Sequence, residues 1–181
     1  MTMGTGKAMN ILFTILFLVV FGLGRQAVGG EISAPFFQVQ KDTRCPVCGM
    51  FVGKYPQWLS QARLSDGTVA AFDGIKDLAA YAFSPQEFGA APGAVVTDIA
   101  VRDYYSQAWM DGRQAHYVVG SDILGPMGHE LIAFSSRAGA ENFLQDHHGT
   151  EILGFAEISP QLIESLRKGH KMKTHGTAGM K

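Results

Sequence analysis

The chain has 181 residues, of which 46% are hydrophobic and 17% charged, and its formal net charge is −1 at pH 7. This composition is that of a folded protein, and the length suits one domain or two very small ones. Because the chain has no strong basic excess, the composition argues against nucleic acid as a partner.

The first thirty residues differ in kind from the rest. Lys7 precedes an almost uninterrupted apolar run over 11–24, which has the length of the apolar part of a signal peptide and is short for a membrane span. Ala27 and Gly29 place small residues at the positions that signal peptidase reads. We therefore expect a signal peptide over 1–29, a linker over 30–44 and a periplasmic protein. An uncleaved anchor, which would associate the protein with the membrane, is the alternative.

The sequence from 57 to 101 predicts a ββαβ unit. Strands are expected over 57–64 and 69–72, on either side of a hairpin turn at 65–68. Asp73 is the expected N-cap of a helix whose apolar residues follow the i, i+3, i+4, i+7 spacing, namely Ile75, Leu78, Ala79 and Ala82. A loop rich in Pro, Gly and Ala then leads to a strand over 94–101.

The second half repeats this order. Strands are expected over 114–119 and 131–134, followed by a helix over 137–146 with Ser135 as its N-cap and a closing strand over 151–155. A last short helix begins at Ser159-Pro160 and runs to 167, with proline at its first position. We therefore predict an α+β fold of two related ββαβ units, 45–102 and 103–158, that share one sheet system. The segment 168–181 has no periodicity and is expected to be disordered.

Both cysteines of the chain fall in one short stretch, Cys45-Pro46-Val47-Cys48-Gly49-Met50. Its three sulfur atoms form a cluster of soft donors, and thiolate and thioether ligands together favour Cu(I). In an exported protein such a pair becomes a disulfide unless a metal or a reductant intervenes. A bridge across so small a loop would stabilise the fold little, so a purely structural disulfide is a poor explanation.

Metal binding and redox catalysis are the two sharper interpretations of this motif. In an extended segment, Cys48 and Met50 would point to the same face and share one ion. A zinc site would need four ligands, and a second C-x-x-C pair is absent. A thioredoxin-like pair would open a helix that lowers the pKa of the first thiol. Gly49 and the segment 51–56 are poor helix formers, which disfavours the redox interpretation.

Further donors are scattered along the chain. Met127, between Pro126 and Gly128, lies in a loop that either brings a third thioether or covers the core. Four weaker candidates are Met110, His116, His147 and His148, and sequence does not select among them. The two histidines and two methionines of the tail suit either a solubilising segment or a weak copper-collecting arm. No serine–histidine–carboxylate set, phosphate-binding loop or paired-carboxylate motif stands out, so we do not expect an enzyme.

Six short motifs occur in an order that resembles one known family, the NosL proteins. They are Cys48-Gly49-Met50, Phe72-Asp73-Gly74, Asp103-Tyr104, Trp109-Met110-Asp111, Ala115–Ser121 and Gly125–Gly128. The similarity runs from about Cys45 to Ile158. NosL proteins are the copper-binding accessory proteins of nitrous oxide reductase, and the resemblance implies a fold of two related ββαβ units.

The resemblance also implies a function and a set of ligands. The chain is expected to carry Cu(I) in the periplasm and to deliver it while the copper centres of nitrous oxide reductase are assembled. The family's Cys-Gly-Met motif maps onto Cys48 and Met50, and its Pro-Met-Gly motif onto Met127; Cys45 is expected to contribute. Many members resemble lipoproteins with a cysteine just after the signal sequence, and no such cysteine precedes Cys45 here.

Two alternatives remain beside the copper carrier. One is a periplasmic thiol–disulfide oxidoreductase that assists copper-site maturation, and the other is a structural binding partner of the reductase in which the cysteines are incidental.

Overall fold

A computed structural model describes residues 34–169 of the chain. The expected signal peptide over 1–29 and the tail from 170 onward lie outside these residues. Within them, no helix combines the length and the apolar character that crossing a membrane requires.

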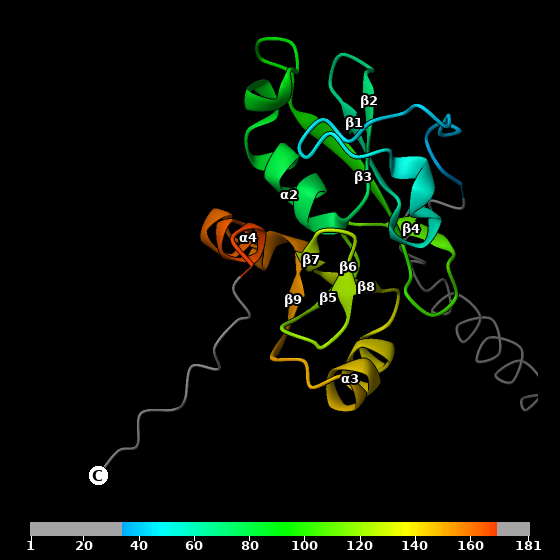
Figure 1. The fold of residues 1–181 in the computed structure, drawn as a ribbon, viewed down its shortest axis with the longest axis vertical. Helices are drawn as coiled ribbons and strands as arrows, with labels where there is room; N and C mark the ends of the chain where they lie inside the picture. The colour runs from blue at the N-terminus through cyan, green and yellow to red at the C-terminus, as the bar shows by residue number, and fades with distance from the viewer. Residues whose placement is uncertain (1–33, 170–181) are drawn as a thin grey trace, which may run out of the picture. The chain divides into compact units, whose positions relative to one another are not determined.

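The first ββαβ unit is built on one antiparallel sheet (Figure 1). Two short 3-10 turns, η1 (Val52–Lys54) and η2 (Pro56–Trp58), lead into β1 (Ser60–Leu64), which pairs with β2 (Val69–Phe72) and with β3 (Val96–Arg102). The helix α2 (Ile75–Phe83) and the 3-10 turn η3 (Pro85–Phe88) connect β2 to β3. The strand order is β2-β1-β3-β4, because β4 (Trp109–Asp111) adds to the outer edge of β3.

The second unit has the same arrangement. The strands β5 (His116–Val119), β8 (Ile132–Phe134) and β9 (Glu151–Gly154) form an antiparallel sheet in the order β8-β5-β9. In both units the first strand is therefore central, the second lies on one side and the third on the other. The helix α3 (Arg137–Asp146) joins β8 to β9, as α2 joins β2 to β3. The predicted pair of related ββαβ units is confirmed.

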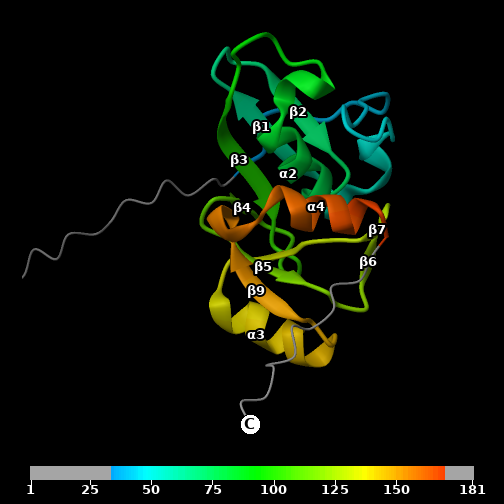
Figure 2. The ribbon, with the colours of Figure 1, turned by 90° about the vertical axis from the view of Figure 1, so that its left-hand side faces the viewer.

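Two additions distinguish the second unit. A small hairpin of β6 (Leu124–Gly125) and β7 (Gly128–His129) is inserted between β5 and β8. After β9, the 3-10 turn η4 (Phe155–Glu157) leads to α4 (Pro160–Arg167), which crosses between the two units and packs against α2 and β7 (Figure 2). The short helix predicted from Ser159-Pro160 to 167 is confirmed, and the Ser159 hydroxyl accepts the Leu162 N–H.

Three expectations about local structure are wrong. The two units form separate sheets, because β4 occupies the edge of β3. The first strand begins at Ser60 because Pro56 starts a 3-10 turn where a strand was expected. The helix N-cap is Ser136 in place of Ser135: the Ser136 Oγ accepts the Gly139 N–H at 3.1 Å.

The core runs through both units. Buried residues of the first unit and of α4 form one cluster with the inner face of β5 and with Leu131, as illustrated by Phe72, Leu78, Tyr117 and Leu166. A smaller cluster fills the space between the second sheet and α3, with Val118, Ile132, Phe134, Ala140 and Phe143. Because the larger cluster spans both units, the N-terminal end of α2 and the β6–β7 hairpin are held near each other, and the candidate site lies there.

Candidate metal centre

The cysteine motif forms a tight chain reversal. The Cys45 N–H donates to the Met50 carbonyl at 2.9 Å, and the Gly49 N–H donates to the Cys45 carbonyl at 2.9 Å. Gly49 has a φ of +79°, in the left-handed region that glycine adopts without strain. The Arg44 guanidinium donates to the Gly49 carbonyl at 2.7 Å and fixes the turn from outside. The turn presents both thiols to the same neighbour, the N-terminal end of α2.

Two carboxylates at that end of α2 meet the two thiols. Asp73 precedes the N-cap Gly74 and Asp77 lies in the first turn of the helix, and their carboxylates lie close together. The Cys48 thiol contacts Asp73 Oδ1 at 3.1 Å, and the Cys45 thiol contacts Asp77 Oδ2 at 3.5 Å. The expected N-cap role of Asp73 is wrong: Gly74 is the N-cap, and the carboxylate turns to Cys48.

This cluster of Cys45, Cys48, Asp73 and Asp77 has the dimensions of a metal site. One donor atom from each residue lies within 4.8 Å of the others. Two thiolates that share one ion at about 2.3 Å each would fit this spacing. The second carboxylate oxygen of Asp73 is buried and has no hydrogen-bond partner among the described residues. An unpartnered buried oxygen is costly, and a cation nearby would offset that cost.

Both thiols are held in the protonated form. Burial, with a smaller contribution from the neighbouring Asp77 charge, raises the pKa of Cys45 to about 12. Burial also raises the pKa of Cys48 far above its usual range, and the hydrogen bond to Asp73 acts in the same direction. A metal must therefore displace protons in order to bind as a thiolate complex. The structure holds both cysteines as free thiols.

Met127 lies at the mouth of the same site. It sits between β6 and β7 and is 48% exposed, and it lines one surface hollow together with Cys48, Lys76 and Asp77. Val47 and Arg167 complete the lining of this hollow. The structure therefore brings the predicted residues Cys45, Cys48 and Met127 to one place.

Met50 occupies a different position from the one expected. It is half-buried at the exit of the turn and is paired through its carbonyl with Cys45, and it is absent from the residues that line the hollow. The expectation that Cys48 and Met50 lie on one extended segment is wrong, because Cys48 belongs to the turn and Gly49 is left-handed. Its role as a ligand stays a prediction.

The other predicted donors lie in other parts of the fold. Met110 pairs with Val101 at the edge of the first sheet, and His116 pairs with Phe134 in the second. His147 is the C-cap of α3, and its Nδ1 lies 3.0 Å from Asp122 Oδ1. None of these residues belongs to the cluster.

Two buried ionisable residues beside the site, Lys76 and Glu130, were missed by the sequence reasoning. The Lys76 ammonium donates to the carbonyls of Met127 and His129, both at 2.9 Å. The Glu130 side chain accepts hydrogen bonds from the main-chain N–H of Lys76 at 2.6 Å and from the main-chain N–H of Leu131 at 2.9 Å. Glu130 thereby caps α2 from the second unit. Its side chain fills the space beside Gly74, where an added Cβ would lie 2.2 Å from Glu130 Oε2.

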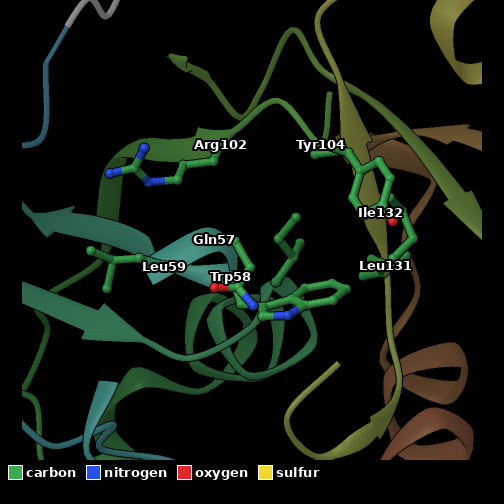
Figure 3. Close-up of a pocket in the computed structure, with 9 residues that line it drawn as sticks. Gln57, Trp58, Leu59, Arg102, Tyr104, Leu131 and Ile132 are labelled. Carbon is green, nitrogen blue, oxygen red and sulfur yellow. The ribbon is translucent and has the colours of Figure 1, made fainter. Parts of the chain in front are cut away.

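A second hollow lies at the junction of the two sheets and has a different character (Figure 3). It is lined by Trp58, Leu59, Tyr104, Leu131 and Ile132, among others, and none of its lining residues is a cysteine, histidine or carboxylate. Arg102 also lines it, but its guanidinium points away from Tyr104 and lies over the Trp109 ring at 4.6 Å. This hollow offers no donor set for a metal.

Comparison with known proteins points to one family. The family model for NosL matches residues 35–163 of the chain. The copper-binding lipoprotein NosL of Stutzerimonas stutzeri is 27% identical over 128 residues, which span 66% of this chain and 64% of that protein. The chain therefore matches slightly less than two thirds of the length of this relative.

Two solved structures are similar. The crystal structure of the copper chaperone NosL from Shewanella denitrificans is 23% identical, with a TM-score of 0.60, and the match covers 70% of this chain and 97% of that one. This likeness shows the fold. The solution structure of the apo-NosL protein from Achromobacter cycloclastes is 28% identical, with a TM-score of 0.45, and covers 57% of this chain and 87% of that one.

Proposed function

The chain belongs to the NosL family, and from this premise we propose that it is an exported Cu(I) metallochaperone. In this proposal it delivers copper for the assembly of the copper centres of nitrous oxide reductase, and the reductase or its maturation machinery is the partner. The names of its relatives, a copper-binding lipoprotein and a copper chaperone, support copper as the cargo and support export.

One observation carries the proposal: two thiols lie close together, and a thioether lies near one of them. The buried Cys45 belongs to one donor cluster with Cys48, and Cys48 and Met127 line the same hollow. Thiolate and thioether ligands together favour Cu(I). We assign Cys48 and Met50 as ligands, with Cys45 and Met127 as contributors.

The site suits a carrier that must release its cargo. Met127 is exposed, so a partner's sulfur ligand can approach the ion from the open side. The raised pKa of each thiol makes protons compete with the metal at neutral pH. Both properties lower the barrier to transfer by ligand exchange.

The alternative of a thiol–disulfide oxidoreductase finds no support in the geometry. Such enzymes depend on a cysteine with a lowered pKa at a helix N-terminus. Here burial raises the pKa of both thiols, and the motif leads through a left-handed glycine into a bridge between Arg44 and Phe51. We therefore propose that the protein is not an enzyme.

The direct test is an anaerobic titration of the reduced protein with Cu(I) in competition with a chromophoric Cu(I) chelator. We expect one ion per chain, and a loss of affinity of at least about tenfold in Cys48→Ser and in Met50→Leu. Met110→Leu is the matched control, because Met110 lies in β4, where it pairs with Val101 at the edge of the first sheet, and does not line the hollow.

Two results would contradict different parts of the proposal. If the reduced protein does not bind Cu(I), the proposal that it carries copper is wrong. If nitrous oxide reductase matures normally in cells that carry the double Cys→Ser variant, the wild-type protein can still bind Cu(I), but the proposal that it delivers copper through these cysteines is wrong.

A further inference from the structure

Lys76 is an unusual residue for the interior of a small domain. Its side chain is only 2% exposed, and no carboxylate of the described residues lies within 4.0 Å of its ammonium. Burial of an ammonium costs free energy unless hydrogen-bond acceptors or opposite charges offset the loss of hydration. The partners it has are two main-chain carbonyls, those of Met127 and His129.

Those two carbonyls belong to the tip of the β6–β7 hairpin and to the strand that follows it. Pro126 and Met127 form the tip, because Gly125 pairs with Gly128, and His129 lies in β7. Gly128, between the two carbonyls, has a φ of +87°. A two-stranded hairpin of this size has little stability of its own. The ammonium, which comes from 51 positions earlier in the chain, therefore fixes the hairpin tip to α2.

The same turn of α2 also holds the cysteine motif. Asp77 follows Lys76 directly and contacts the Cys45 thiol, and Asp73 contacts the Cys48 thiol. The N-terminal end of α2 thus contacts the cysteine turn through Asp73 and Asp77, and the β6–β7 hairpin through the Lys76 ammonium. Glu130, three residues after Met127, completes the link by accepting the Lys76 N–H.

We propose that Lys76 is a positioning residue that places the Met127 thioether over the Cys48 thiol as a ligand to the carried ion. The proposal rests on the function proposed above. Lys76 does not touch the ion; it acts by holding the carbonyls of Met127 and His129, on either side of Gly128. Without it, the exposed Met127 side chain would sample many positions, and the entropy cost of binding would rise.

The test is a double-mutant cycle of Lys76→Leu and Met127→Leu, with Cu(I) affinity measured anaerobically by chelator competition. Leucine adds no donor to the hollow that Lys76 lines. We expect each single variant to lower the affinity by about tenfold, within the range typical of residues that orient ligands. The double variant should be no weaker than either single variant, because both changes remove the same ligand. Lys41→Leu, at an exposed position of the linker, is the matched control.

A second readout separates positioning from a general effect on folding. In protein with ¹³C-labelled methionine methyl groups, the Met127 signal should shift on addition of one equivalent of Cu(I). In Lys76→Leu it should stay at its free position while the ion still binds through the cysteines. If Lys76→Leu does not fold, Lys76→Gln takes its place, because its shorter, neutral side chain cannot bridge both carbonyls.

The outcomes are distinct from those that test the function. A wild-type protein that binds no Cu(I) contradicts the copper carrier. A wild-type protein that binds Cu(I), together with a folded Lys76 variant that keeps full affinity and the Met127 shift, overturns the positioning role alone. Additive losses in the double variant would also overturn it.

Discussion

At the scale of single residues, the Cys48 thiol has surroundings opposite to those of a reactive cysteine. It is partly buried and donates to Asp73 at 3.1 Å, and burial is the main cause that raises its pKa. The nearby Cys45, whose pKa is raised to about 12, behaves alike. A thiol of ordinary pKa, near 8.5, would be about one quarter ionised at pH 8, whereas Cys45 would be ionised in about one molecule in ten thousand.

Because only the thiolate is alkylated at an appreciable rate, we predict slow alkylation of both cysteines. In the metal-free, reduced protein at pH 8, iodoacetamide should modify each more than about tenfold more slowly than in the urea-unfolded chain. Peptide mass spectrometry over time measures both rates. Asp73→Asn should speed the reaction at Cys48, since the hydrogen bond to Asp73 raises its pKa. Equal rates in the folded and unfolded protein would contradict the assigned environment.

Gly74 is a second residue whose identity the structure explains. An added Cβ would lie 2.2 Å from Glu130 Oε2, and that carboxylate cannot swing away because two main-chain amides hold it. We predict that Gly74→Ala destabilises the fold by about 1–3 kcal/mol, the usual cost of overpacking. Urea unfolding followed by tryptophan fluorescence measures this change.

Gly53→Ala is the control for Gly74→Ala, because its added Cβ would meet its nearest atom at an ordinary 3.5 Å. Equal stability of the two variants would show that Glu130 does not fill the space beside Gly74.

At the scale of elements, α2 depends on a cap from the other unit. Its N-cap, Gly74, has no side chain to accept an amide, and Glu130 supplies the missing acceptor. Burial raises the pKa of Glu130 to about 8, although the Lys76 charge and two amide donors oppose the shift; the nearby Asp77 charge adds to it.

The raised pKa of Glu130 has a consequence for stability. Between its ordinary pKa and about 8, the unfolded chain has released this proton while the folded chain retains it. The free energy of unfolding should therefore fall as the pH rises from about 5 to 8, by a few kcal/mol for this group. Glu130→Gln should flatten that dependence in urea unfolding at several pH values. A variant with the slope of the wild type would exclude Glu130 as its source.

The elements themselves were largely predictable, and the exceptions have physical causes. The helix over 137–146 and α4 follow from apolar spacing and serine caps, which are local properties of the sequence. The start of α2 was mistaken because Asp73 has the character of an N-cap, yet a thiol from 25 positions earlier and a glutamate from the second unit determine its surroundings. Contacts between distant segments leave no periodicity in a sequence.

At the scale of the whole molecule, Asp103 joins the two units. It follows β3, and its carboxylate accepts five hydrogen bonds, from Tyr105, Ser106 and Ser135. Burial opposes ionisation, but the hydrogen bonds from Ser106 and Ser135 prevail and lower its pKa. The stability it contributes is therefore present above its ordinary pKa and is lost as the pH falls through its lowered value.

We predict that Asp103→Ala lowers the free energy of unfolding by about 2–4 kcal/mol at pH 7, since five part-buried hydrogen bonds to one charged acceptor are lost. Asp98→Ala is the control, because Asp98 is half-exposed and its ion pair with Arg63 spans 3.9 Å. Urea unfolding of both variants measures the difference, and a loss no greater than that of the control would contradict the joining role.

The candidate site was only partly predictable for the same reason. Cys45, Cys48 and Met127 were recognisable from their chemistry and from the resemblance to NosL. Asp73 and Asp77 were not, because two carboxylates at i, i+4 on a helix are common and become informative only once thiols face them. Lys76 carried no signal at all, since a lysine near a helix start is expected to be exposed, and only the fold shows it buried.

We propose that this member of the NosL family holds Cu(I) through sulfur at the cysteine turn. X-ray absorption at the copper K edge, on reduced protein loaded with one equivalent of copper, reports both the oxidation state of the ion and its ligands. We expect the edge of Cu(I) and a first shell dominated by sulfur, with fewer sulfur scatterers in Cys48→Ser. A Cu(II) edge, or a first shell of nitrogen and oxygen that is unchanged in Cys48→Ser, would contradict the proposed site.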